Sequence, residues 1–181
     1  MSEKATFDKT QALRYGMNYG AVVGILTGVS FLCSIGGAEQ VGLGLLSNVM
    51  ALAAVYVAAR MIRAFDREIA PLSFGQTCRM VAYTYFFAIL LTAAIQYVYF
   101  AVFDQGRFAA LIQEMFTQPE YRRMLENMAS EQDVETMIQT TTDTMQRPES
   151  ATMQLMWMNI FIALFMLLPT ALIARIGKGR Q

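Results

Sequence analysis

The sequence lacks histidine entirely, and its 181 residues include only 2 cysteines and 15% charged residues. The absence of histidine removes the commonest metal ligand and the usual general base near neutral pH. Two cysteines are too few for a disulfide-stapled scaffold. A formal net charge of zero argues against a polybasic protein that binds nucleic acid. Because soluble domains carry about 25% charged residues, the shortage of charge indicates that much of the chain lies outside water.

Four stretches of the sequence carry no charge at all, namely residues 15–35, 41–59, 80–103 and 153–174. A helix needs roughly 20 apolar residues to cross the hydrocarbon core of a bilayer, and each stretch is close to that length. Buried helices of a soluble protein are the alternative, but such helices keep a polar stripe. A signal peptide has a shorter apolar region than the first stretch. The pattern therefore predicts four retained membrane-spanning helices in one membrane domain that covers residues 1–181.

The distribution of Lys and Arg predicts the orientation of these spans. If the spans alternate, both termini and the link between spans two and three lie on one side of the membrane. That side carries 10 of the 14 basic residues but only 4 of the 14 acidic residues. We therefore expect both termini in the cytoplasm of a bacterium, the spans in its inner membrane, and residues 104–152 on the outer, acidic side.

Residues 104–152 show helical patterns and do not read as a simple linker. Apolar residues recur at helical spacing at Phe108, Leu111, Ile112, Met115 and Phe116. Pro119 fits the first turn of a second helix, and Ser130 with Asp133 fits the start of a third. We predict two or three short amphipathic helices, whose apolar stripes pack on each other, on the membrane surface or on a partner.

Small residues predict how the first two spans pack. Span one has a glycine at every fourth position: Gly16, Gly20, Gly24 and Gly28. Such a face lets two helices approach closely in a membrane, either within the chain or at a dimer seam. Span two repeats this spacing with Ser47 and Ala51, and with Ala54 and Ala58. Because a five-residue link joins the two spans, we expect the glycine face to pack on this alanine face.

The link between spans two and three contains a signal for the start of a helix. Pro71 ends a basic extension of span two, and Ser73 and Gln76 have the spacing of a capping box. We therefore expect the third helix to begin near Phe74, before the membrane-spanning stretch itself.

Three side-chain amides and two hydroxyls fall at similar depths in the outer half of the predicted bundle. They are Asn48, Gln96, Asn159, Ser30 and Thr27. An amide in hydrocarbon needs partners, so we expect these side chains to face the interior. They then serve either as interhelical hydrogen bonds, each contributing about 0.6 kcal/mol, or as the floor of an outward-facing polar pocket.

Catalytic and cofactor chemistry find little support in the sequence. The four charge-free stretches hold no ionisable acid or base of the kind that marks ion and proton pathways, and the chain has no nucleotide or hydrolase motif. The methionines of residues 104–152 occupy apolar stripe positions, where methionine fills space. Cys33 and Cys78 should lie near opposite membrane faces, too far apart for a disulfide. We expect no metal, no cofactor and no enzymatic activity.

The order of these features resembles the bacterial four-span membrane family named domain of unknown function 4199. The resemblance rests on four segments: Tyr15-Gly16, Leu72-Ser73-Phe74-Gly75-Gln76, Gln118-Pro119-Glu120 and Leu172-Ile173-Ala174. It implies an all-α fold, an integral membrane four-helix bundle with a short-helix insertion. It carries over no active-site residue.

Together these observations favour a non-enzymatic scaffold or interaction subunit that uses its outer helices. The alternative is a small transporter or channel subunit with a polar pocket in the outer half of the bundle. The expected partners are the lipid bilayer, a membrane or periplasmic protein, and a second copy in a homo-oligomer; nucleic acid is not expected.

Overall fold

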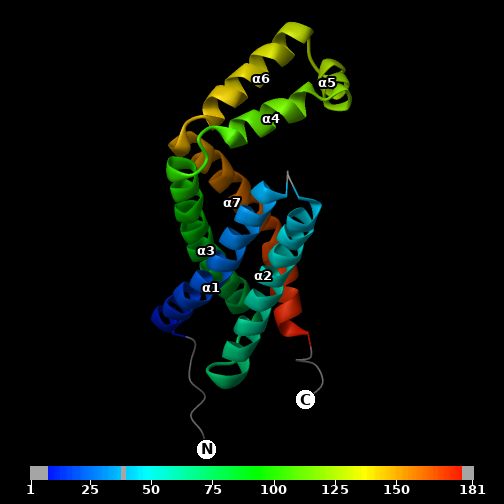
Figure 1. Cartoon of the computed structure of the whole chain (residues 1–181). Coiled ribbons are helices and arrows are strands. Elements are labelled where there is room, and N and C mark those ends of the chain that lie inside the picture. The colour runs from blue at the N-terminus through cyan, green and yellow to red at the C-terminus, as the bar shows by residue number, and fades with distance from the viewer. Residues whose placement is uncertain (1–7, 38–39, 177–181) are drawn as a thin grey trace, which may run out of the picture. The chain divides into compact units, whose positions relative to one another are not determined.

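The computed structural model describes residues 8–37 and 40–176, and within them every regular element is a helix (Figure 1). The chain order is α1 (Lys9–Gly36), α2 (Val41–Glu68), α3 (Phe74–Val102), α4 (Arg107–Thr117), α5 (Pro119–Glu126), α6 (Glu131–Met145) and α7 (Pro148–Arg175). The predicted all-α fold is confirmed.

Four of these helices are long and apolar enough to cross a membrane: α1, α2, α3 and α7. Each has 28 or 29 residues, which corresponds to about 42 Å of helix at 1.5 Å per residue. A hydrocarbon core is only about 30 Å thick, so each of these helices is long enough to cross it. The protein is therefore a multi-pass membrane protein with four long apolar helices.

The chain divides into two compact units, and α3 and α7 contribute to both. The larger unit comprises Met1–Ala94 and Met156–Gln181, and the smaller unit comprises Ile95–Leu155. The larger unit therefore holds α1, α2 and most of α3 and α7. The smaller unit holds α4, α5 and α6, together with the last turns of α3 and the first turns of α7.

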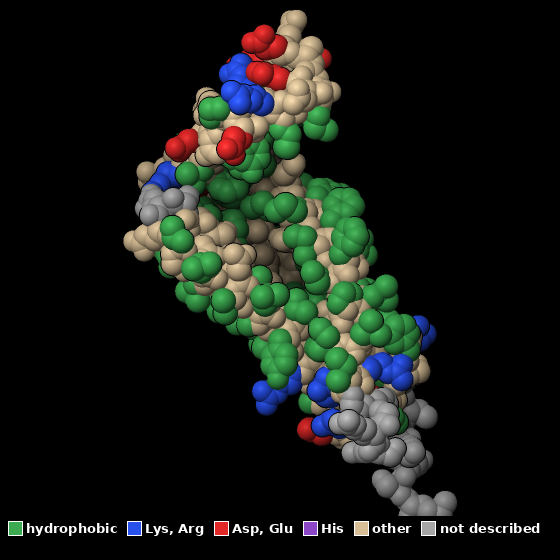
Figure 2. Space-filling model, turned by 90° about the vertical axis from the view of Figure 1, so that its right-hand side faces the viewer, with side chains coloured by type: hydrophobic (Ala, Val, Ile, Leu, Met, Phe, Trp, Pro, Cys, Tyr) green, Lys and Arg blue, Asp and Glu red, His purple; other side chains and the backbone are tan. Residues whose placement is uncertain are grey.

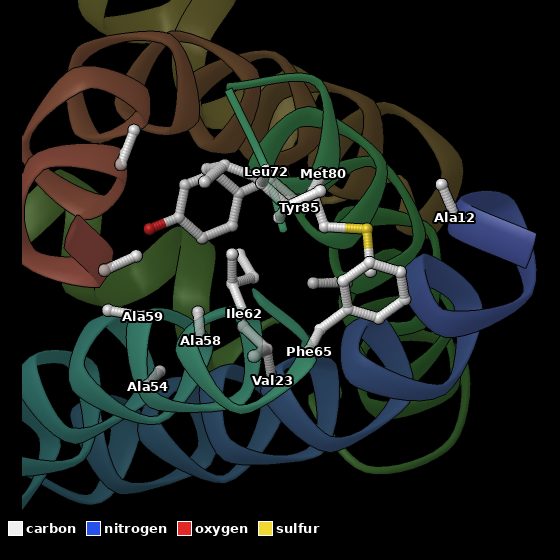
Figure 3. Close-up of a cluster of buried hydrophobic side chains, with 14 of the residues drawn as sticks. Ala12, Val23, Ala54, Ala58, Ala59, Ile62, Phe65, Leu72, Met80 and Tyr85 are labelled. Atoms are coloured by element: carbon white, nitrogen blue, oxygen red, sulfur yellow. The ribbon is translucent and has the colours of Figure 1, made fainter. Parts of the chain in front are cut away.

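A cluster of buried apolar side chains forms the core of the larger unit (Figure 3). Phe65 and Ile62 of α2 and Met80 of α3 are its largest fully buried members. The ring of Tyr85 of α3 lies next to Ile62 in Figure 3, and its hydroxyl is 2.6 Å from the Thr170 hydroxyl of α7. The core thus combines large side chains with alanines, which lets the helices approach closely.

The predicted capping box at the start of α3 is confirmed. The backbone N–H of Ser73 donates to the side-chain oxygen of Gln76 over 2.7 Å, and the backbone N–H of Gln76 donates to the Ser73 hydroxyl over 3.4 Å. The carboxylate of Asp66 accepts from the backbone N–H of Leu72. These bonds tie the α2–α3 link together and fix the first residue of α3 at Phe74, as the sequence predicts.

In the smaller unit, α4, α5 and α6 pack on one another. Ala109 of α4 is buried, as are Val134 and Ile138 of α6. The buried carboxylate of Asp104 accepts from the backbone N–H groups of Gly106 and Phe108 over 3.1 and 3.0 Å. It therefore satisfies N–H groups that the first turn of α4 leaves unpaired. Residues 104–152 thus contain three short helices.

Candidate functional site

The glycine face of α1 packs against α3. A Cβ built on Gly16 would stand 2.6 Å from the Cβ of Tyr83, and one built on Gly20 would stand 2.6 Å from the Cβ of Phe87. At Gly24 the nearest atom is the carbonyl oxygen of Ala88, at 2.9 Å. These approaches leave no room for another chain along this part of the face.

The prediction that the glycines pack on the alanines of α2 was wrong. α1 and α2 do pack together, and the Ser30 hydroxyl of α1 donates to the Ser47 carbonyl of α2 over 2.8 Å. The atoms nearest to Gly16, Gly20 and Gly24, however, all belong to α3. The small residues Ala54 and Ala58 are buried in the common core, to which α1, α3 and α7 also contribute side chains. Gly28 is also buried.

A hydroxyl pair accompanies the close approach of α1 and α3. The hydroxyls of Thr27 and Thr92 lie 2.6 Å apart, and Thr92 also donates to the Gly24 carbonyl over 3.3 Å. Thr27 bonds in addition to the carbonyls of Val23 and Gly24 in its own helix. Thr27 and Ser30 therefore face other helices of the bundle, and each makes an interhelical hydrogen bond.

The three amides have different surroundings. Asn48 is exposed on α2 and donates to the Gly44 carbonyl of its own helix over 3.2 Å. The prediction that Asn48 faces the interior was therefore wrong: its side chain is exposed, and its amide nitrogen bonds to the backbone of its own helix. Gln96, in the smaller unit, is only 3% exposed, and its side-chain oxygen is buried without a partner. Asn159, in the larger unit, has a buried side-chain nitrogen without a partner.

An arginine closes the carboxyl end of α7, and sequence reasoning missed this contact. Arg63 of α2 donates through Nε to the Ala174 carbonyl over 3.2 Å and through Nη2 to the Ile173 carbonyl. The last carbonyls of a helix lack intrahelical partners and carry partial negative charge, so a guanidinium satisfies both needs. The sequence signal was only a basic run near the end of α2, which does not name a partner.

The α5 helix presents an apolar surface that the described chain leaves uncovered. Tyr121 is 41% exposed, Met124 is 54% exposed, and Met128, just after the helix, is 80% exposed. We call these three residues the α5 apolar patch. Met137 of α6 is also exposed. The short helices therefore bury only part of the apolar stripes that the sequence predicts.

The opposite flank of α5 is charged and faces α6. Arg122 lies 3.0 Å from the Glu126 carboxylate, 3.6 Å from that of Glu135 and 3.9 Å from that of Glu131. The hydrogen bond to Glu126 is the main cause that raises the pKa of Arg122 above its usual value, and the negative charges of the three carboxylates add to it. Arg122 thus links α5 to α6 as a permanent cation.

Among the residues that the structure describes, no group of three Cys, Asp or Glu side chains could hold a metal ion. Cys33 and Cys78 are both free thiols.

No curated protein and no solved structure shows significant similarity to this chain. Residues 14–175 match a family described as protein of unknown function, DUF4199. The match covers most of the sequence and includes all four long apolar helices, so the chain belongs to the DUF4199 family.

Proposed function

We propose that the protein is a non-enzymatic interaction subunit of the bacterial inner membrane, and that α4, α5 and α6 contact a protein partner on the extracytoplasmic side. The observation that carries the proposal is the α5 apolar patch of Tyr121, Met124 and Met128, each more than 40% exposed. Exposed apolar patches on small helical units are typical of interaction surfaces, and aromatic residues and Met are enriched at the centres of interfaces.

The orientation in this proposal rests on the Lys and Arg residues near the ends of the long helices. Arg14, Arg60, Arg67 and Arg79 all lie near the end of the bundle where α1 begins and α2 ends. The positive-inside rule assigns that end to the cytoplasm. A carboxyl-terminal fluorescent-protein fusion should then fluoresce, and a carboxyl-terminal alkaline phosphatase fusion should be inactive. An active phosphatase would reverse the orientation.

Site-specific photocrosslinking in living cells tests the partner. A photoreactive amino acid at Met124 or Met128 should give an adduct of one defined mass, and the same residue at exposed Gln139 of α6 should not. The adduct should disappear when Tyr121 is replaced by Asp in the same chain. Equal adducts at Met128 and Gln139, or none at any position, would contradict the proposal.

A second candidate function, a small transporter or channel subunit, is favoured by one observation. The buried side-chain oxygen of Gln96 and the buried side-chain nitrogen of Asn159 have no hydrogen-bond partner, and such groups are ready to bind a polar ligand or water. Reconstituted protein should then conduct a small solute, and Gln96→Leu should reduce the flux. If Gln96→Leu only raises stability, the amide has no transport role.

A further inference from the structure

One face of α2 is apolar along one half and cationic along the other, so it is complementary to an anionic phospholipid. Six residues make up this face, and at 3.6 residues per turn they fall within about 80° of one another around the helix. We call this set the α2 stripe: Val49, Leu52, Tyr56, Arg60, Arg63 and Arg67. The buried residues Ala58, Ile62 and Phe65 lie on the opposite side of α2, so the stripe faces away from the core.

The apolar half of the stripe is open to the surroundings of the bundle. Val49 is 60% exposed, Leu52 is 72% exposed and Tyr56 is 60% exposed. From Val49 to Tyr56 the stripe rises about 10 Å along the helix axis, a length that suits the upper part of an acyl chain. In a membrane-spanning helix these side chains meet lipid.

The cationic half continues on the same line. Arg60 and Arg67 are exposed, and neither forms an ion pair with any other described residue. Arg63 stands between them and holds the carbonyls of Ile173 and Ala174. That contact brings the end of α7 alongside the stripe and fixes the middle guanidinium in place. Figure 2 shows basic side chains gathered at one end of the hydrophobic surface of the long helices.

We propose that the α2 stripe binds an anionic phospholipid of the phosphatidylglycerol or cardiolipin class, with its phosphate between Arg60 and Arg67. Guanidinium groups recognise phosphate oxygens through paired hydrogen bonds, and basic residues near a bilayer surface attract anionic headgroups. Phosphatidylethanolamine fits less well because its own ammonium group offsets the phosphate charge. A free phosphate would use the arginines but leave the apolar half of the stripe without a role.

Lipid titration of the detergent-purified full chain, followed by native mass spectrometry, tests this assignment. The test variant is Arg60→Gln with Arg67→Gln, which removes two cations and keeps the hydrogen bonds from Arg63 of α2 to the end of α7. The matched control is Arg14→Gln with Arg79→Gln, which removes two exposed cations from α1 and α3. The added probes are phosphatidylglycerol, phosphatidylethanolamine and soluble glycerol 3-phosphate.

The wild-type chain should retain phosphatidylglycerol in preference to phosphatidylethanolamine. The test variant should bind phosphatidylglycerol about thirtyfold more weakly, at the scale expected for two headgroup-level cations, and the control should keep its affinity within about twofold. No loss in the test variant, or an equal loss in the control, would overturn the proposal.

Displacement of the lipid by glycerol 3-phosphate at an equal concentration would also overturn the proposal, because it would show that the apolar half contributes nothing. If the double variant does not fold, Arg67→Gln alone is compared with Arg79→Gln, since Arg67 lies in the last turn of α2. The single variant should then show the larger loss of phosphatidylglycerol, and equal losses would refute the site.

Discussion

Gly20 of α1 lies so close to Phe87 of α3 that a Cβ on the glycine would stand 2.6 Å from the Phe87 Cβ. The same position would lie 2.7 Å from the Thr84 carbonyl oxygen, so the backbone of α3 itself closes the groove. Helices that approach this closely in a membrane gain packing contacts that lipid cannot replace. The glycine face is therefore the seam between α1 and α3.

The first prediction concerns this seam. Gly20→Ala should destabilise the bundle by about 1–3 kcal/mol, because the added methyl group forces the two helices apart. Gly42→Ala in α2 is the matched control, since a Cβ there meets nothing within 4 Å. Unfolding in mixed dodecylmaltoside and SDS micelles, followed by the fluorescence of the single Trp157, measures both. Equal stability of the two variants would show that the seam tolerates a larger residue.

The second prediction concerns the hydroxyl pair of the same seam. Thr92→Val should cost about 0.6 kcal/mol and at most about 1.7 kcal/mol, the range measured for hydrogen bonds between membrane helices. Thr84→Val is the control, because the Thr84 hydroxyl bonds only to the Met80 carbonyl of its own helix. A double-mutant cycle of Thr92→Val with Thr27→Val isolates the interhelical contribution. A coupling energy near zero would mean that the 2.6 Å contact does not stabilise the bundle.

Local signals in the sequence predict the elements of this fold well. Charge-free stretches mark the four long helices, and the Ser73–Gln76 capping box predicts the first residue of α3, because both depend only on near neighbours in the chain. Pro119 predicts the start of α5 for the same reason, since proline is preorganised for the first turn.

Partners between helices were harder to predict. The glycine spacing predicts that some helix approaches α1 closely, but it does not identify that helix as α3. The short link makes α1 and α2 neighbours, but it does not determine which face of α1 meets α2. Depth in the membrane is likewise no guide to direction. Asn48 sits at a depth similar to Ser30, yet the amide turns to its own backbone and the hydroxyl crosses to Ser47.

The third prediction concerns the arginine that closes α7. Arg63→Met keeps the apolar stem but removes the donors to Ile173 and Ala174. It should destabilise the bundle by about 1–3 kcal/mol, the range for a hydrogen-bonding group left without its partner, and should speed amide exchange in the last turn of α7. Arg79→Met, at an exposed position of α3, should change neither. Unchanged exchange in α7 for Arg63→Met would contradict the capping role.

The fourth prediction concerns the charged flank of α5. Arg122→Gln removes the contacts to Glu126, Glu135 and Glu131, so α5 should separate from α6 more often and its amides should exchange several-fold faster. Arg123→Gln is the matched control, because it removes the same charge from the neighbouring exposed position. Surface ion pairs are screened by salt, so the difference between the two variants should be largest at low ionic strength and shrink in 1 M NaCl.

A difference in amide exchange between Arg122→Gln and Arg123→Gln that persists in 1 M NaCl would show that Arg122 acts through packing of its stem rather than through its charge. Equal exchange at low salt would show that α5 is held to α6 by apolar contacts alone.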